Sequence, residues 1–286
     1  MPLTKVKDLL AFAEEHKFGV PAINVFDYNS IKYAVMAAEE ARMPLIIQYY
    51  PGFCVHAPLK DIRDMAVAMA ARASVPIAVH LDHSKEFETA VSGLGAGFPS
   101  IMVDGSSLPY EENAALTKSV ARCAHAMCVD VEAELGHVGT GKNLEDMTNT
   151  DFFTDPEQAV EFTLRTQVDS LAIAVGNAHG DYIRTPELDF DRIAKLREVL
   201  NIPLVMHGGS GIPVDQLQKA VRCGMSKFNI ATEYQQIFFA SMEKYFGENP
   251  GSGAYFKALR EIERPCVNFV KEKIDILNPD HYQLSF

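Results

Sequence analysis

Short apolar runs alternate with amphipathic stretches along the whole chain. Eight runs are rich in aliphatic and β-branched residues: 21–26, 44–50, 76–83, 100–106, 129–136, 170–176, 203–208 and 227–232. Their apolar residues are nearly continuous, which is typical of parallel strands covered on both faces. Eight such strands with helices between them predict a (β/α)8 TIM barrel, with residues 1–286 as a single domain. A doubly wound open sheet is the alternative, but no G-x-G-x-x-G follows the first run.

The stretches between the runs carry helix signals. Ser84 is a predicted N-cap for a helix over residues 85–94, and Asp155 followed by Pro156 predicts another helix start. Residues 232–277 read as one long helical stretch, longer than an eighth barrel helix needs. We therefore expect an extended helical C-terminus that packs on the barrel or reaches a neighbouring subunit.

Polar side chains gather where the predicted strands end. Seven of the eight runs end in, or are followed by, such residues: Asn24, Asp82 and His83, Asp104, Glu132 and Glu134, Asn177 and His179, His207, and Asn229. Barrels of this kind place their chemistry at the carboxyl ends of the strands. The long polar loop over residues 136–153 follows the fifth run, and loops of that length are usually functional or mobile. The sequence thus predicts one site at this end of the barrel.

Three histidines are the candidate metal ligands. His83, His179 and His207 follow three different strands, and three imidazoles can hold one divalent ion with a position left open for substrate. The alternative is that each ring is an ordinary hydrogen-bonded side chain at the barrel mouth. His80 shares a strand face with Asp82 and is expected beside the ligands rather than among them.

Several acids are candidates for proton transfer. Asp82 adjoins a proposed ligand and is placed to move a proton, or alternatively to orient the histidine. Asp104 and Glu134 either hold a second cation position or form structural salt bridges. Glu145 and Asp146 lie in the long loop, from which either acid is able to act as a base.

Glycine-rich turns follow the seventh and eighth runs. The turns contain Gly208, Gly209 and Ser210 in one case and Asn229, Ile230, Ala231 and Thr232 in the other. Loops after strands seven and eight form the usual phosphate site of these barrels, where backbone N–H groups and a helix N-terminus face the anion. The alternative is a pair of ordinary turns with helix caps.

Charge and composition narrow the class of protein. The 26 lysines and arginines are outnumbered by 38 acids, so the net charge is −12, which argues against nucleic-acid binding. No apolar run approaches the roughly 20 residues that cross a bilayer, and the first residues lack a signal-peptide core. The five cysteines have irregular spacing and no C-x-x-C, so we expect buried free thiols and a cytoplasmic protein: Cys54, Cys123, Cys128, Cys223 and Cys266.

The positions of the lysines argue against a Schiff-base mechanism. No lysine ends a central run, and Lys227 begins the eighth, which places it at the opposite end of the barrel. A Schiff-base mechanism then has no nucleophile, and a metal ion must serve as the electron sink.

These motifs together resemble the class II, metal-dependent ketose-bisphosphate aldolases, in the branch of the tagatose- and fructose-1,6-bisphosphate enzymes. The resemblance covers most of the chain. It rests on PAINVF in the first run, HLDHS at 80–84, MVDGS at 102–106, VEAELG at 131–136, DSLAIAVGNAHG at 169–180, MHGGSG at 206–211 and NIATE at 229–233.

The resemblance implies one catalytic zinc ion and a reversible cleavage. It implies His83, His179 and His207 as zinc ligands and Asp82 as the group that exchanges a proton with the C4 oxygen. The products are dihydroxyacetone phosphate and an aldehyde. Asp104 and Glu134 match acids near the metal ion.

The resemblance also implies a phosphate site with a monovalent cation, Na⁺ or K⁺, nearby. The residues that match it, with Asn24 as a further substrate contact, are Gly180, Gly208, Gly209, Ser210, Asn229, Ile230, Ala231 and Thr232. The proton at the remaining carbon would be handled by a loop acid, for which Glu145 is the better match. The partners implied are a small sugar phosphate and further copies of the chain in a homo-oligomer, a dimer or tetramer, with no nucleic acid and no membrane.

Two departures leave the substrate open. Residues 48–52 are bulkier than the small serine-containing turn that holds the distal phosphate in many fructose enzymes, and the loop acids are displaced. A distal phosphate would need a cation, which Arg260 or Arg264 of a partner subunit would supply. The alternatives are a ketose 1-phosphate with an unphosphorylated far end, a metal-dependent hydrolase or epimerase, or a non-catalytic scaffold.

Overall fold

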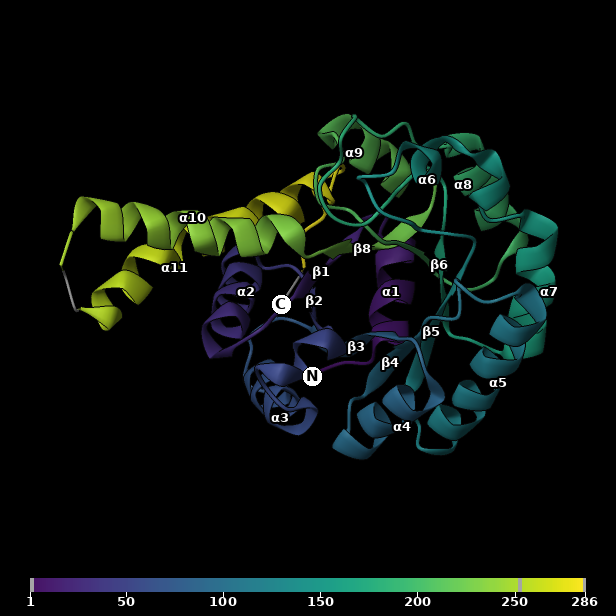
Figure 1. Ribbon diagram of the computed structural model, residues 1–286, viewed down its shortest axis with the longest axis horizontal. Coiled ribbons are helices and arrows are strands. Elements are labelled where there is room, and N and C mark those ends of the chain that lie inside the picture. The colour runs from purple at the N-terminus through teal and green to yellow at the C-terminus, as the bar shows by residue number, and fades with distance from the viewer. Residues whose placement is uncertain (1–2, 252–253, 285–286) are drawn as a thin grey trace.

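Eight parallel strands close into a barrel in chain order (Figure 1). The computed structural model describes residues 3–251 and 254–284. The strands are β1 (Val20–Asn24), β2 (Leu45–Tyr49), β3 (Ile77–Ser84), β4 (Ser100–Val103), β5 (Asp130–Leu135), β6 (Ser170–Ile173), β7 (Leu204–Met206) and β8 (Met225–Ile230). Strand β8 pairs with β1 and completes the ring. The predicted (β/α)8 TIM barrel is confirmed.

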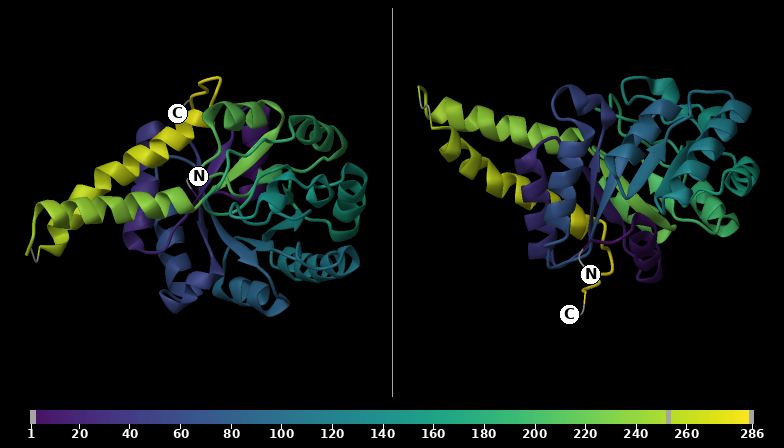
Figure 2. Two further views of the ribbon diagram at one scale, coloured as in Figure 1. Left: turned by 45° about the horizontal axis from the view of Figure 1, so that its top comes forward. Right: turned by 90° about the horizontal axis from the view of Figure 1, so that it is seen from below.

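Helices surround the barrel and connect its strands (Figures 1 and 2). They are α2 (Tyr28–Ala41), α3 (Leu59–Ala70), α4 (Phe87–Ala96), α5 (Tyr110–Ala126), α7 (Pro156–Thr166), α8 (Phe190–Val199) and α9 (Val214–Arg222). Helix α1 (Val6–Glu15) packs against β3 and β8 at the amino end of the barrel. Short helices η1 (Pro51–Val55), α6 (Leu144–Thr148) and η2 (Thr150–Phe152) lie in the loops after β2 and β5.

The strands are buried on both faces, as their continuous apolar runs predict. Every strand residue is buried except His83, which is partly exposed near the end of β3. The interior of the barrel also holds polar side chains, among them Glu132 and Lys227, and both are almost completely buried. Asn24, Asp82, Glu134 and Asn229 lie at or near the carboxyl ends of their strands, as the sequence predicts.

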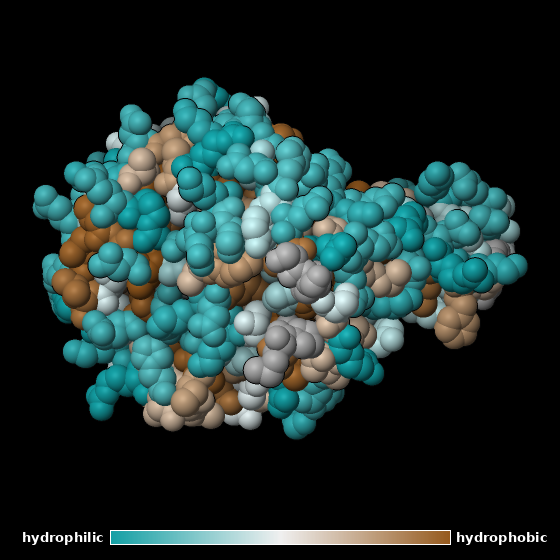
Figure 3. Space-filling view, turned by 180° about the vertical axis from the view of Figure 1, so that it is seen from behind, coloured by the Kyte–Doolittle hydropathy of each residue, from teal (hydrophilic) through white to brown (hydrophobic). Residues whose placement is uncertain are grey.

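The helical C-terminus is an antiparallel pair rather than one continuous stretch. Helices α10 (Thr232–Glu248) and α11 (Tyr255–Ile276) pack along each other and project from the barrel (Figures 1 and 2). The base of α11 packs against α2. Seen from behind, this hairpin is hydrophilic along much of its length (Figure 3). It nevertheless exposes four aromatic side chains: Phe239, Phe246, Tyr255 and Phe256.

Of the two predicted helix starts, one is confirmed and one is wrong. Asp155 caps α7 as predicted, because its side chain accepts from the N–H groups of Glu157 and Gln158. The prediction for Ser84 is wrong, since its carbonyl accepts from the N–H of Asp104 and keeps it in β3. Helix α4 consequently begins later, at Phe87.

The prediction of five buried cysteines is also wrong. All five are free thiols, but only Cys266 is buried, and Cys54, Cys123 and Cys128 are exposed. Small size lets a thiol sit on the outer face or at the end of a helix as easily as in a core. Within the described part of the chain, no helix is both long enough and apolar enough to cross a membrane.

Candidate functional site

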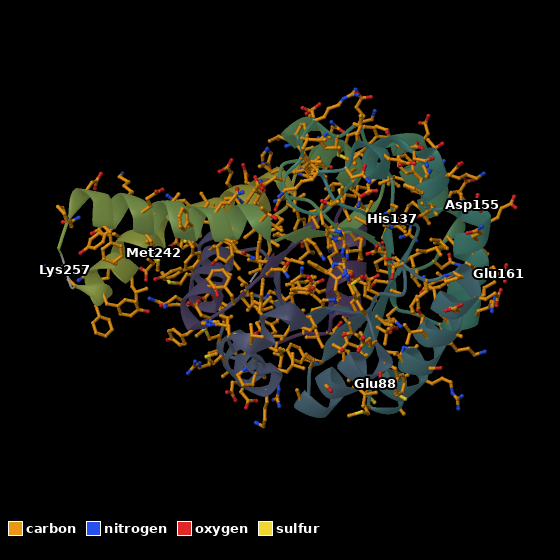
Figure 4. The ribbon with its side chains drawn as sticks, viewed as in Figure 1. Glu88, His137, Asp155, Glu161, Met242 and Lys257 are labelled. Carbon is orange, nitrogen blue, oxygen red and sulfur yellow. The ribbon has the colours of Figure 1, made fainter. Side chains whose placement is uncertain are left out.

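A cavity of about 400 Å³ opens at the carboxyl ends of the strands. All eight strands, or the loops that follow them, contribute to its lining. Twelve of the residues predicted from the sequence line it: Asn24, Asp82, His83, Asp104, Glu134, His179, Gly180, Gly208, Ser210, Asn229, Ala231 and Thr232. His137, another lining residue, is labelled in Figure 4 beside the loops of this end. The cavity therefore brings most of the predicted site together.

Three imidazole rings converge at the base of this cavity. His83 Nε2 lies 2.9 Å from His207 Nδ1, and His179 Nε2 lies 3.4 Å from the same atom. The three facing nitrogens lie within 4.8 Å of one another. His207 itself is fully buried and is not among the residues that line the cavity.

The opposite nitrogen of each ring lies against an acceptor of the protein. The pairs are His83 Nδ1 with Asp104 Oδ2 at 2.9 Å, His179 Nδ1 with the Val138 carbonyl at 3.0 Å, and His207 Nε2 with Glu132 Oε1 at 3.0 Å. The contacts of His83 and His179 favour the tautomers that leave a lone pair on the facing nitrogen. The contact with Glu132 favours the same for His207, whose Nε2 also lies 3.1 Å from Asn229 Nδ2. In those tautomers three lone pairs face one another, and a divalent cation satisfies all three. The donor set fits a metal ion.

Negative charge around the rings supports the same conclusion. Burial alone would lower the pKa of His83, but Asp82, Asp104 and Glu134 outweigh it and raise the pKa to about 9. Burial, together with Asp104, raises the pKa of Glu134 to about 8. The cluster therefore stabilises an additional positive charge. In the absence of a metal ion, bound protons supply that charge.

Asp104 and Glu134 form a second possible ligand group with His83. Asp104 is occupied by His83 through one oxygen and by the backbone and hydroxyl of Ser106 through the other. Glu134 Oε2 is buried without a hydrogen-bond partner and lies 3.7 Å from His207 Nδ1. Asp104 is thus an orienting carboxylate in this arrangement, whereas Glu134 has an oxygen free for a cation.

Asp82 is held as a carboxylate beside the rings. Its Oδ2 accepts from Asn24 Nδ2 at 2.8 Å, and its Oδ1 from Asn229 Nδ2 at 3.3 Å. Burial tends to raise its pKa, but the charges of His83 and His207 and the hydrogen bond from Asn24 outweigh burial and lower it. A buried, ionised carboxylate that faces a cavity is able to accept a proton from a bound hydroxyl group.

The prediction that Lys227 lies at the far end of the barrel is wrong. Strand β8 begins at Met225, so Lys227 shares the interior face with Asn229, two residues later. Lys227 Nζ lies 2.7 Å from Glu132 Oε2, and the other oxygen of Glu132 contacts His207. Strand alternation is the signal that identifies this lysine, once the strand is extended to its true start.

Three further side chains support the rings and loops. His80 stands against Ser100, with Nε2 3.8 Å from Glu132 Oε2, as expected of a neighbour of the ligands. Asn177 Nδ2 donates to the His207 carbonyl at 3.0 Å. Tyr182, which the sequence did not suggest, donates to the Gly208 carbonyl at 2.8 Å and joins the loops after β6 and β7.

The loop after β7 packs closely against the loop after β6, and the loop after β8 leads into helix α10. Gly208 has φ 63°, and a Cβ there would lie 1.9 Å from the Ala178 carbonyl oxygen, so only glycine fits. Helix α10 has Ala231 at its N-cap, which offers no side chain to the first N–H groups. The Gly209 N–H is not available to a ligand, because it donates to the Asn229 carbonyl. Neither Gly209 nor Ile230 lines the cavity.

The two loop acids lie in different environments. Asp146 is buried and accepts from the Thr140 N–H and from Asn143. Glu145 is exposed on α6 and does not line the cavity. The base of this loop is fixed, because Thr140 pairs with His179 along the backbone. Glu145 therefore lies on the outer part of the loop.

The two arginines proposed for a distal phosphate lie outside this cavity. Arg264 on α11 pairs with Glu40 at 2.9 Å. Arg260 lies on the projecting hairpin, near Lys257, which Figure 4 labels far from His137. Neither residue reaches the site of its own chain.

Residues 4–281 match the model of the family described as fructose-bisphosphate aldolase class-II. The chain belongs to this family. Membership of this family supports aldolase function, carbon–carbon bond cleavage in a sugar phosphate, for the chain, and the hydrolase and scaffold alternatives lose their support.

Solved structures agree with this assignment. The crystal structure of the YdjI aldolase from Escherichia coli K12 is 33% identical, with 97% of this chain and 98% of that one covered and a TM-score of 0.86. A putative fructose-1,6-bisphosphate aldolase from Coccidioides immitis is 30% identical over 96% of each chain, with a TM-score of 0.84. The fructose-bisphosphate aldolase of Campylobacter jejuni, at 23% identity and a TM-score of 0.82, supports the fold.

Proposed function

We propose that this class II aldolase reversibly cleaves a ketose 1,6-bisphosphate, tagatose- or fructose-1,6-bisphosphate, with one zinc ion. The products are dihydroxyacetone phosphate and a phosphorylated aldehyde. The observation that carries the proposal is the convergence of three imidazole nitrogens beside the carboxylate of Asp82, whose pKa is lowered. The family supports the aldol chemistry, whereas the substrate and the identity of the metal ion are part of this proposal.

His83 and His179 through Nε2 and His207 through Nδ1 would hold the zinc ion, with Glu134 near it. A bound divalent ion supplies positive charge that offsets the charge developing on the dihydroxyacetone phosphate half during cleavage. Asp104 and Glu132 fix the orientation of two of the rings from behind.

The phosphate of dihydroxyacetone phosphate would lie on the loops after β6, β7 and β8. The groups that face the cavity there are Gly180, Gly208, Ser210, Asn229, Ala231 and Thr232. The uncapped first turn of α10 supports anion binding at this position. No lysine or arginine is among the described cavity residues of these loops, so we include a monovalent cation, Na⁺ or K⁺, near the phosphate.

Proton transfer is divided between two acids. Asp82 takes the proton of the C4 hydroxyl group while the C4 carbonyl forms, the C3–C4 bond breaks, and its electron pair remains on C3. An acid of the loop after β5 then protonates C3, and we assign this role to Glu145. Because Glu145 is exposed outside the cavity, the outer part of the loop must move inward for that step.

We also propose a cytoplasmic homo-oligomer, a dimer or tetramer. The exposed aromatic side chains on the α10–α11 hairpin support association, because an isolated chain would leave them in water. The free thiols are compatible with a reducing compartment.

The test is cleavage of tagatose-1,6-bisphosphate and fructose-1,6-bisphosphate before and after chelation, with triose phosphate release as the readout. We expect one sugar to be cleaved, chelation to abolish cleavage, and zinc to restore it. If neither sugar is cleaved but dihydroxyacetone phosphate still exchanges its C3 proton, the substrate is a different ketose 1-phosphate. Loss of both activities in the zinc-loaded protein would refute the proposal.

A further inference from the structure

The backbone on both sides of Gly208 is held by other parts of the chain. In the peptide group before it, the carbonyl of His207 accepts a hydrogen bond from Asn177 Nδ2 at 3.0 Å. In the peptide group after it, the carbonyl accepts from the Tyr182 hydroxyl at 2.8 Å, and the N–H donates to the Asn229 carbonyl at 2.9 Å. Three of the four polar atoms of these two peptide groups therefore have partners within the chain.

The fourth polar atom is the Gly208 N–H, and nothing among the described residues accepts from it. Gly208 lines the cavity, where a side chain at this position would collide with the Ala178 carbonyl. Backbone N–H groups that are removed from water are nearly always paired, so one left unpaired at a cavity is available to a ligand. The direction of this donor depends on the groups that hold the two peptide planes.

Tyr182 connects the loop after β6 to the turn formed by residues 208–211. Its hydroxyl accepts from the Ala178 N–H at 2.9 Å while it donates to the Gly208 carbonyl. Its ring lies beside the other end of the turn, where a Cβ on Gly211 would be 3.2 Å from Tyr182 Cδ2. Burial raises the pKa of the phenol to about 12, so the hydroxyl group remains a donor near neutral pH. One side chain thus contacts both ends of the turn.

The segment that carries Tyr182 is itself fixed on two sides. The Ile183 N–H donates to the Gly141 carbonyl at 3.0 Å, which joins the segment to the loop after β5. Asp181 accepts from Gln236 of α10 at 2.9 Å, which joins it to the helix that follows β8. The phenol of Tyr182 is therefore a fixed point against which the turn after β7 is held.

The turn needs such a point because three of its four residues, 208, 209 and 211, are glycines. Glycine leaves the backbone more conformational freedom than any other residue, and ordering a free turn on binding costs affinity. We propose that Tyr182 is a positioning residue that holds this turn with the Gly208 N–H directed at the phosphate of dihydroxyacetone phosphate. This inference rests on the proposed function. Tyr182 does not line the cavity and acts on the substrate only through Gly208.

The experiment measures exchange of the C3 proton of dihydroxyacetone phosphate by the zinc-loaded enzyme over a range of substrate concentrations. Tyr182→Phe removes only the hydroxyl group. We expect it to raise KM by about three- to tenfold, the equivalent of one hydrogen bond, and to leave kcat within about twofold. The inhibition constant of inorganic phosphate should rise by a similar factor, and the zinc content should not change.

Tyr33→Phe is the matched control. The buried Tyr33 hydroxyl also donates to a backbone carbonyl, that of Leu259, at 2.8 Å, and it lies off the cavity. This variant should lower the melting temperature about as much as Tyr182→Phe does, yet leave KM and phosphate inhibition unchanged. Asn177→Ser is a second test, because it removes the donor that holds the preceding peptide group and should also raise KM.

An unchanged KM in both Tyr182→Phe and Asn177→Ser, or an equal rise in Tyr33→Phe, would overturn the inference. A loss of zinc with an unchanged KM would also overturn it, since Tyr182 would then act on the histidines rather than on the phosphate. In each of these cases proton exchange by the wild type still upholds the proposed function. A zinc-loaded wild type without exchange would refute the proposed function and the inference together.

Discussion

Removing the buried charge of Lys227 should destabilise the barrel through Glu132. Lys227→Met replaces a fully buried ammonium group with an apolar side chain of similar length. Glu132 then keeps its contact with His207 but loses the cation 2.7 Å from its other oxygen. A lone carboxylate remains in the interior of the barrel.

The size of the effect follows from that distance. Two unit charges 2.7 Å apart attract by about 6 kcal/mol at an effective dielectric constant of 20. Part of that attraction offsets the cost of burying both charges, and breaking one partner of a buried pair generally costs about 3–5 kcal/mol. We expect Lys227→Met to lower the free energy of unfolding by about 3–5 kcal/mol. Adding Glu132→Gln removes the stranded charge and should restore at least about 1 kcal/mol.

The assay is urea unfolding of the chelated protein, followed by a zinc titration of each variant. Lys60→Met is the matched control, because Lys60 and its partner Asp64 are both exposed, and a surface salt bridge contributes less than about 1 kcal/mol. Zinc affinity should also fall in Lys227→Met, since Glu132 no longer holds His207 in the same way. A loss below about 1 kcal/mol, or a double variant no more stable than the single one, would refute this account of the pair.

Three further predictions concern the acids and the metal-free protein. Asp82→Asn should retain zinc and lower turnover by about 10²–10⁴-fold, and near-normal turnover would assign proton transfer from the C4 hydroxyl to another group. Glu145→Ala should slow exchange of the dihydroxyacetone phosphate proton measured by isotope release, while an unchanged rate would exclude it from that step. In the chelated protein, His83 and Glu134 have pKa values of about 9 and 8, above their unfolded values of 6.5 and 4.5. The folded state then binds more protons than the unfolded state, so stability should fall from pH 6.5 to 9, and a flat or rising urea midpoint would contradict the shifts.

The sequence predicted what strand order alone determines. Parallel strands end at one mouth, so His83, His179 and His207 could be placed together without any knowledge of their rings. Residues whose place in the site depends on the direction of the side chain were harder to predict. Lys227 was placed at the wrong end because the apolar run hid the true start of β8.

Loop conformation was the other limit. A polar loop has no periodic pattern to show which acid faces the cavity, so Glu145 and Asp146 could not be told apart, although one is exposed and the other buried. Gly209 looked like an anion-binding glycine, but its N–H is used between the two loops. Lys85 is the one lysine or arginine among the described residues that line the cavity, and a single lysine after a strand gave no sign of this in the sequence.

The wide separation of the three rings along the chain has a consequence for folding. His83 and His207 are 124 residues apart and meet only through the closed barrel. A chain being synthesised has at most two of the three rings until β7 has emerged, and the ring of strands closes only when β8 pairs with β1. Because the three rings come together only when these distant segments have met, we expect a metal ion to bind late rather than to nucleate the fold. An ion held by the three rings, as proposed, would bind the closed barrel and stabilise it by mass action, so we expect metal uptake to report completed folding.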